Sequence, residues 1–300
     1  MGDIELAMNC NNFIIFFEGR EGTTALVDIL NNFEQISIVR QEGSRGWEPF
    51  DYHNCGSLSL ANFQKCLGMI YGDELLDWEN LNYIYSQTAK NSLEVFERNK
   101  FKSIGCKMRF SPPNKELRHQ QQEFRKYKQE FKQLMFKILK EYDITAFVAI
   151  RQDILRRSLS KYHGDGFKRN GHLQFKLATG KIKREDIPKV HVDCEELAQD
   201  IIKWERKLQE KKMLLQKFRH LGIKAYPLLY EDFCADAFSY LENFCQKLDI
   251  SYSSDDITNA LNQGTSFQKV HSEDISEFVI NHEEVLEKFG DLPKAGTASL

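Results

Sequence analysis

An apolar run followed at once by a glycine-containing turn constrains this chain more than any other feature. Residues 13–17 read Phe-Ile-Ile-Phe-Phe, which is typical of a strand buried on both faces of a parallel sheet. Gly19 and Gly22 follow, around Arg20, and Thr23 begins a run with helical periodicity. Glycine lets the backbone approach an anion closely, and the first N–H groups of a helix point at it. The stretch therefore predicts an α/β fold with an anion site at this turn.

The turn differs from the P-loop of nucleotide-hydrolysing proteins, which reads Gly-x-x-x-x-Gly-Lys-Ser/Thr. Gly22 is followed by Thr23, so the lysine is missing, and Arg20 inside the turn is the nearby cation. The competing interpretation is a plain tight turn between a strand and a helix. The fully apolar strand and the sequence Arg-x-Gly-Thr-Thr favour the anion site over that interpretation.

A second apolar run, residues 146–150, leads directly into Arg151. Asp153 is a good helix N-cap, so a helix is predicted to begin at the next residue. Arg151 is then at the carboxyl end of a strand, where ligands bind in open α/β sheets. Ser160 lies two turns along the helix on the stripe of Asp153, and a guanidinium with a hydroxyl suits a phosphate dianion. The alternative is an ordinary turn before a solvated basic helix.

The first turn resembles that of the sulfotransferases that use 3′-phosphoadenosine 5′-phosphosulfate. Their first loop reads roughly Lys/Arg-Ser-Gly-Thr/Ser-Thr and binds the 5′-phosphosulfate, and Arg20-Glu21-Gly22-Thr23-Thr24 is similar to it. The resemblance implies that Arg20, Gly22, Thr23 and Thr24 bind this co-substrate, with Arg20 also catalytic. Glu21 replaces the usual serine. Because an acid is unfavourable beside a phosphosulfate, Glu21 is expected to point away from it.

The second cluster is similar to the 3′-phosphate site of the same family, which has an arginine at the strand end and a serine in the next helix. The resemblance implies that Arg151 and Ser160 bind the 3′-phosphate. Ser160 follows Arg151 by nine residues, where eight is commoner, and Ser158 follows it by seven, so Ser158 is the alternative. Two matching motifs at the ends of two buried strands are stronger together than either alone.

A third similarity concerns the acceptor. Glu48-Pro49-Phe50 resembles a sequence that many bacterial sulfotransferases carry after the second strand, which implies that Glu48 is the catalytic base. Glu42 and His53 are alternatives for that role, and a Glu48 that merely caps a turn is the structural alternative. Gly105-Cys106-Lys107 is similar to a Gly-x-Lys strand of the family, so Lys107 and Arg109 are candidates to face the site.

The resemblance extends from Phe13 to about Phe289 and implies an α/β, P-loop-like three-layer fold with a central parallel sheet flanked by helices. We expect one domain over residues 1–300, with a helical insert at 58–100 that shapes the acceptor pocket and a frayed tail at 291–300. Further strands are predicted at residues 36–39, 103–110 and 223–229, and further helices at 115–142, 193–220 and 235–248.

Tyr-Glu-Asp-Phe at residues 230–233 follows the last predicted strand, and a similar segment recurs in these sulfotransferases. Glu231 and Asp232 are interpreted as capping or pairing residues rather than as catalytic ones. A later segment, residues 280–285, is similar to a family segment near the nucleotide, and no contact is assigned to it.

Composition excludes several other classes. The net charge is −3, with 41% hydrophobic and 28% charged residues, so nothing draws the chain to nucleic acid or to an anionic membrane. Its apolar runs are far shorter than the roughly 18–20 residues needed to span a bilayer. The seven cysteines lack Cys-x-x-Cys spacing, which argues against a zinc site and favours free thiols in the reducing cytoplasm.

The function implied is transfer of a sulfuryl group from the nucleotide co-substrate to a hydroxyl or amine of a small molecule, such as a natural product. No metal is expected, because arginines and the helix N-terminus supply the positive charge. The sequence leaves the acceptor and the oligomeric state open. A P-loop kinase of a small molecule, which needs the missing lysine and a strand-end acid for magnesium, is one alternative. A non-catalytic nucleotide-binding protein is the other.

Overall fold

The computed structural model describes residues 11–41, 48–50, 58–72, 78–86, 93–94, 103–111, 121–165, 176–177, 179–265 and 274–292. Its strands are β1 (Phe13–Phe16), β2 (Ile36–Ile38), β3 (Arg40–Gln41), β4 (Leu93–Glu94), β5 (Ser103–Met108), β6 (Thr145–Ile150) and β7 (Ala225–Leu229). Its α-helices are α1 (Thr23–Leu30), α3 (Leu60–Tyr71), α4 (Trp78–Ser86), α5 (Gln121–Glu141), α6 (Ile154–Asp165), α8 (Cys194–His220), α9 (Tyr230–Ala235), α10 (Ala237–Lys247), α11 (Ser254–Asn262) and α12 (His282–Phe289). Two short 3₁₀ helices, η3 (Arg184–Asp186) and η4 (Ile275–Glu277), complete the described elements.

Five strands form one parallel sheet in the order β2-β5-β1-β6-β7, and β3 pairs with β4 in a separate antiparallel ladder. Phe16 is in register with Met108 of β5 and with Val148 of β6, so these three strands reach the same edge of the sheet together. The residues that follow them are thereby brought close in space. The predicted α/β fold with a central parallel sheet flanked by helices is confirmed.

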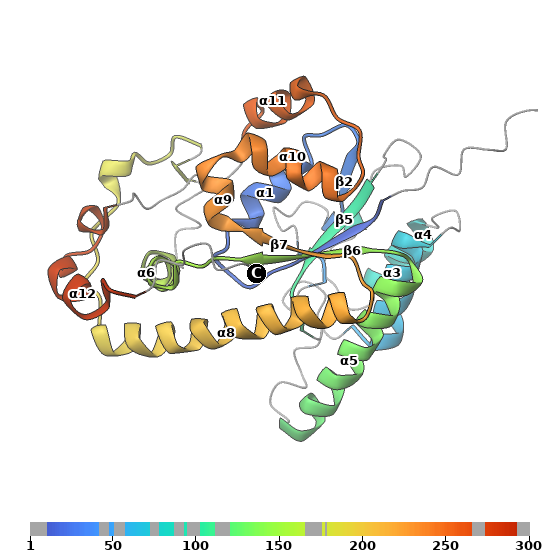
Figure 1. The fold of residues 1–300 in the computed structure, drawn as a ribbon, viewed down its shortest axis with the longest axis horizontal. Coiled ribbons are helices and arrows are strands. Elements are labelled where there is room, and N and C mark those ends of the chain that lie inside the picture. The colour runs from blue at the N-terminus through green and yellow to red at the C-terminus, as the bar shows by residue number, and fades with distance from the viewer. Residues whose placement is uncertain are drawn as a thin grey trace, which may run out of the picture.

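Helices cover both faces of the sheet, as alternation along β1 requires (Figure 1). Phe13 and Ile15 pack in a core with residues of α1, α10 and α11. Ile14 and Phe16 pack in a second core with residues of α3, α5 and α8. All four side chains are buried, which explains why the strand lacks the polar alternation of a half-exposed sheet.

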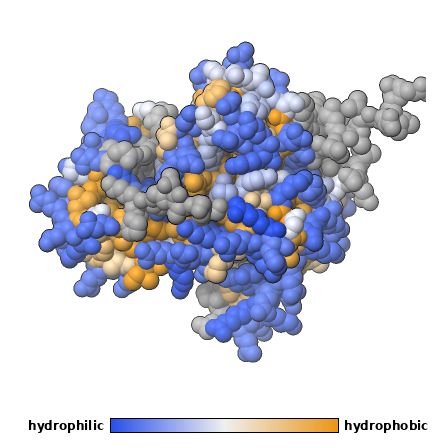
Figure 2. Space-filling model, in the orientation of Figure 1, coloured by the Kyte–Doolittle hydropathy of each residue, from blue (hydrophilic) through white to orange (hydrophobic). Residues whose placement is uncertain are grey.

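A third apolar cluster joins α6 to the amino-terminal half of α8 and to the segment that carries η4 and α12. Val190 and Val279 form an isolated parallel bridge there, and the Asn281 side chain bonds both the N–H and the C=O of Val192. Figure 2 shows mainly hydrophilic side chains on one face of the molecule, with apolar patches near the left end of α8. The helix that follows Arg151 is therefore held against α8 and the carboxyl-terminal segment.

Local sequence explains where the elements begin and pack. The Asp193 carboxylate accepts the N–H groups of Glu195 and Glu196, which caps α8 as predicted. Gly105 of β5 lies under the ring of Phe13, where a Cβ atom would come within 2.1 Å of a ring carbon. Only glycine fits at that position, so the close packing of β5 against β1 depends on Gly105 lying under the Phe13 ring.

The expected boundaries need small corrections. The strand expected to end at residue 39 ends at residue 38, and residues 40–41 form β3 in what was predicted to be a loop. The insert at residues 58–100 contains α3 and α4, as expected, and also β4. The helix predicted at residues 235–248 is α10, which begins at Ala237 because the Asp236 side chain caps it, and a separate short helix, α9, precedes it where no helix was predicted. The single domain and the pocket-shaping role of the insert stay predictions, and residues 293–300 of the tail lie outside the described residues.

None of the helices in the described part of the chain is long and apolar enough to cross a membrane. The cysteines that the structure describes, residues 66, 106, 194, 234 and 245, are free thiols.

Candidate functional site

The turn after β1 has the shape that an anion loop needs. Arg20 and Gly22 both have left-handed backbone conformations, with φ of 69° and 71°. Gly22 is the N-cap of α1 and contributes no side chain to it. A Cβ atom at Gly22 would come within 2.6 Å of the Tyr230 ring, so glycine is required both by its conformation and by this close approach.

Thr23 and Thr24 form the first turn of α1, where backbone N–H groups have no partner within the helix. The positive end of the helix dipole lies at the same point, so the turn attracts an anion. Thr23 is buried and Thr24 is half-buried. The structure thus places Gly22, Thr23 and Thr24 together at the carboxyl edge of the sheet.

The two motifs that the sequence separates by more than a hundred residues lie side by side. Arg151, directly after β6, donates from Nη1 to the Arg20 carbonyl oxygen at 3.3 Å. Arg20 donates from Nη1 to the carbonyl oxygen of Ser160 in α6. The two arginines therefore lie together where β1 and β6 end, and their role in binding a ligand stays a prediction.

Arg151 is held in place and is only 9% exposed. Its guanidinium stacks over the Tyr230 ring, 4.5 Å from the ring centroid. Its Nε atom is buried and has no hydrogen-bond partner among the described residues. Burying an arginine N–H without an acceptor is costly, and the Nε atom of Arg157 is in the same position.

The two candidate serines of α6 differ in their partners. The Ser160 hydroxyl donates to the Arg157 carbonyl oxygen at 2.6 Å. The hydroxyl oxygen can still accept a hydrogen bond, but the hydroxyl can donate to a ligand only by giving up its bond to Arg157. The Ser158 hydroxyl is fully buried and has no partner within the described chain.

Glu231 holds the turn that carries Arg151. Its Oε1 atom accepts the N–H groups of Gln152 at 2.9 Å and Asp153 at 3.0 Å. Asp153 in turn accepts the N–H of Arg156 at 2.8 Å and caps α6. The interpretation of Glu231 as a structural residue agrees with these contacts.

On the other side of β1, Lys107 joins the proposed base to the anion loop. Its Nζ atom lies 2.9 Å from Oε1 of Glu48 and donates to the Thr24 hydroxyl at 2.9 Å. The lysine side chain is 1% exposed and the Glu48 side chain 26%, so the carboxylate is the more accessible member of the pair. Burial lowers the pKa of Lys107, and the Glu48 carboxylate offsets part of that shift. The rival bases Glu42 and His53 lie outside the described residues.

The Glu21 side chain points into the protein, toward α6 and α8. Its carboxylate is fully buried and lies beside Arg157 of α6 and Lys211 of α8. Glu18, at the start of the turn, faces Arg109 and Lys207, each at 3.4 Å. The acids of this turn are therefore neutralised by cations and do not oppose an anion in front of the loop.

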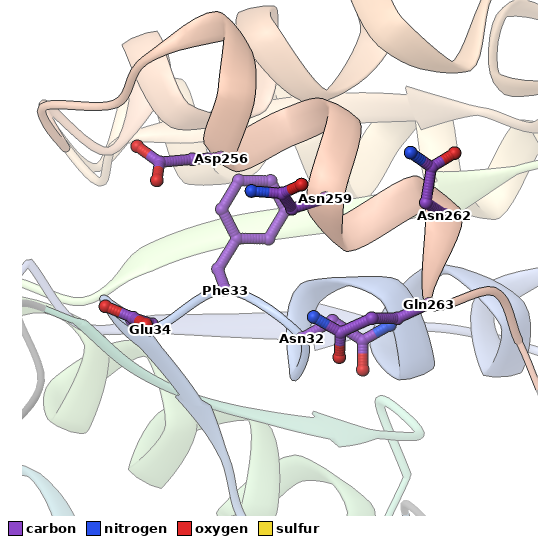
Figure 3. Close-up of a pocket in the computed structure, with 7 residues that line it drawn as sticks. All are labelled: Asn32, Phe33, Glu34, Asp256, Asn259, Asn262 and Gln263. Carbon is purple, nitrogen blue, oxygen red and sulfur yellow. The ribbon is translucent and has the colours of Figure 1, made fainter.

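A separate pocket of about 360 Å³ lies between the turn after α1 and helix α11. Figure 3 shows its mostly polar side chains, which come from the two elements: Asn32, Phe33, Glu34, Asp256, Asn259, Asn262 and Gln263. Because α1 begins at the carboxyl edge and runs back along the sheet, this pocket is at the opposite edge from both arginines. It contains none of the predicted site residues.

Sequence reasoning missed three features of the site. Tyr230 was assigned no role, although it contacts both Gly22 and Arg151. Arg157 and Lys211 were not considered, and their partner Glu21 was the signal, because a buried acid requires cations. In the described part of the chain, no three His, Cys, Asp or Glu residues are grouped so that they could hold a metal ion.

Comparisons with known proteins give little guidance. No family model matches the chain, and no relative was found among the curated proteins. Among solved structures, a sulfotransferase from Alicyclobacillus acidocaldarius is similar over 93% of this chain and 91% of its own, with 15% identity and a TM-score of 0.40. Function is therefore inferred from the geometry of the site rather than from this likeness.

Proposed function

We propose that this protein is a sulfotransferase that moves a sulfuryl group from 3′-phosphoadenosine 5′-phosphosulfate to a hydroxyl or amine of a small molecule, such as a natural product. The observation that carries the proposal is the contact between the two anion motifs. Arg151 donates to Arg20, and Arg20 donates to Ser160, so one nucleotide with phosphates at both ends of its ribose can reach both.

The donor's 5′-phosphosulfate would lie at the N-terminus of α1. The N–H groups from Gly22 to Thr24 and the hydroxyls of Thr23 and Thr24 would hold its oxygens. Arg20 would neutralise the charge that grows on the bridging oxygen. Arg151, with Ser160 or Ser158, would hold the 3′-phosphate.

The acceptor would enter beside Glu48. Its oxygen or nitrogen attacks sulfur in line, the bond from sulfur to the bridging phosphate oxygen breaks, and 3′,5′-adenosine bisphosphate leaves. The proton released from the acceptor passes to the Glu48 carboxylate. Lys107 holds that carboxylate at 2.9 Å and also contacts Thr24, so base and donor loop are fixed relative to each other.

A P-loop kinase is the second candidate, and one contact favours it. Lys107 brings an ammonium group from β5 to Thr24 at the start of α1, where the sequence motif lacks a lysine. Against this, arginines rather than acids follow β5 and β6, namely Arg109 and Arg151. Kinases bind magnesium at that edge through carboxylates, so the cations favour a donor that needs no metal.

The experiment is a comparison of thermal stabilisation by 3′,5′-adenosine bisphosphate with that by ATP and magnesium. A ligand present at a hundred times its Kd stabilises a protein by about 2.7 kcal/mol, which shifts Tm by several degrees. The proposal expects the shift with the bisphosphate, followed by acceptors that gain the mass of one SO₃ group in a metabolite panel. A shift with ATP and magnesium alone would favour the kinase.

A further inference from the structure

Glu21 occupies the position in the anion loop where a small polar residue would be expected, and its carboxylate is completely buried. We propose that Glu21 is a positioning residue, which fixes the loop in its anion-binding conformation through Arg157 of α6 and Lys211 of α8. The inference rests on the proposed function, because it takes the loop's ligand to be the donor's 5′-phosphosulfate.

Both oxygens of the carboxylate are used. Oε1 lies 3.0 Å from Nη2 of Arg157 and accepts a hydrogen bond from Nζ of Lys211. Oε2 accepts the backbone N–H of Glu18 at 2.8 Å. The side chain thus closes the loop on itself and also ties it to two helices.

Each cation makes a second contact, with a backbone carbonyl. Arg157 donates from Nη2 to Gly19 at 3.1 Å, and Lys211 donates to Ala149, next to the end of β6, at 2.6 Å. The Trp204 ring covers the Arg157 guanidinium at 3.7 Å. Loop, strand end and both helices are therefore joined through a single carboxylate.

The loop needs such support because its backbone is strained. Arg20 is not a glycine, yet it has a left-handed conformation, which costs about 1–2 kcal/mol. Gly22, on the other side of Glu21, is left-handed as well. Such conformations persist where the surroundings over-determine them, and Glu21 is the residue between the two.

The charges explain why the three residues depend on one another. Two cations and one anion leave a net charge of +1 in the buried group. Burial lowers the pKa of both Arg157 and Lys211, and Glu21 offsets part of each shift. Without the carboxylate, the two buried cations would keep only the more weakly interacting Glu18 as a counter-charge, and the loop would lose three of its attachments.

The test uses Glu21→Gln, which keeps the shape of the side chain and removes its charge. The double variant Glu21→Gln, Lys211→Met removes one of the unpaired cations and serves if the single variant does not fold. Ile138→Ala, at a buried core position of α5, is the control for loss of stability alone. Two ligands are compared: 3′,5′-adenosine bisphosphate, whose 5′-phosphate reaches the loop, and adenosine 3′-monophosphate, which has no such group.

We expect Glu21→Gln to weaken binding of the bisphosphate by about tenfold or more, because the N–H groups that hold the 5′-phosphate are no longer aligned. Binding of the 3′-monophosphate should stay as in the wild type, and Ile138→Ala should change neither. Equal affinity of wild type and variant for the bisphosphate would overturn the inference, as would an equal loss for both ligands.

Hydrogen exchange of the unliganded proteins separates this inference from the proposed function. Backbone N–H groups of residues 18–24 should exchange faster in Glu21→Gln than in Ile138→Ala at matched stability. If the wild type binds no adenosine nucleotide, the proposed function fails. The exchange rates of the loop then decide by themselves whether Glu21 positions it. Unchanged exchange in the loop would show that Glu21 does not position it.

Discussion

Arg151→Ala should weaken binding of 3′,5′-adenosine bisphosphate by roughly 10- to 100-fold. Arg151 is 9% exposed, its Nε atom lacks an acceptor, and Tyr230 supports its guanidinium at 4.5 Å. A hydrogen bond to a charged group contributes about 1.5–3 kcal/mol, and each 1.4 kcal/mol is tenfold in Kd. Because the side chain is already fixed, little of that energy is spent on ordering it.

The loss should depend on the 3′-phosphate. Isothermal titration calorimetry with adenosine 5′-monophosphate, which lacks that group, should show little difference between wild type and Arg151→Ala. Arg151→Lys keeps the positive charge without the planar guanidinium, so its affinity for the bisphosphate should lie between that of the wild type and that of Arg151→Ala. An identical loss for both nucleotides would mean that the substitution acts by releasing Arg20 and not through a phosphate contact.

Arg156 provides the matched control. It lies five residues after Arg151, in the first turn of α6, it pairs with Asp153 at 3.2 Å, and its side chain is 23% exposed. Arg156→Ala removes the same charge from the same region and should leave the Kd of the bisphosphate nearly unchanged. The assignment of Arg151 to the 3′-phosphate is refuted if Arg156→Ala and Arg151→Ala bind the bisphosphate equally weakly. It is also refuted if Arg151→Ala binds the bisphosphate as tightly as the wild type does.

Three further outcomes are expected. Glu48→Gln should lower kcat by about 10²–10⁴-fold while the Kd of the bisphosphate is kept; unchanged turnover would remove Glu48 from the mechanism. Burial raises the pKa of Glu18, but neighbouring cations led by Lys207 outweigh it and hold the pKa below 4.5, so its stabilisation is present above that pH and lost as pH falls. Glu18→Gln should therefore lower Tm at neutral pH and not in strong acid, and equal losses at both would contradict this. Asp193→Ala should cost about 0.5–2 kcal/mol in urea unfolding, because α8 loses its N-cap.

The fold was predictable where local sequence has one solution. The runs at residues 13–17 and 146–150 contain no polar residue, and only strands covered on both faces accommodate that. Arg20 and Arg151 could be identified because each follows such a strand at the edge where parallel sheets bind ligands. Their contact then follows from β1 and β6 being neighbours, which the register confirms.

Lys211 shows what local sequence does not determine. Its position continues the apolar stripe of α8 that passes through Leu208 and Leu215, and a lysine there reads as a break in the pattern. Its partner Glu21 is 190 residues away, and the pairing depends on how α8 crosses the end of the sheet. Tyr230 is similar, since its contacts with Gly22 and Arg151 arise from packing and not from any motif.

The strand order has a consequence for the newly made chain. β1 is translated first, yet its two neighbours, β5 and β6, begin at residues 103 and 145, while β2, the next strand along, lies elsewhere in the sheet. The apolar segment from Phe13 to Phe16 must therefore remain without a strand partner on the ribosome until β5 has been synthesised, and it keeps one unpaired edge until β6 follows. Unpaired apolar strands of this kind are aggregation-prone, so recombinant yield should depend on chaperone supply and on slow translation.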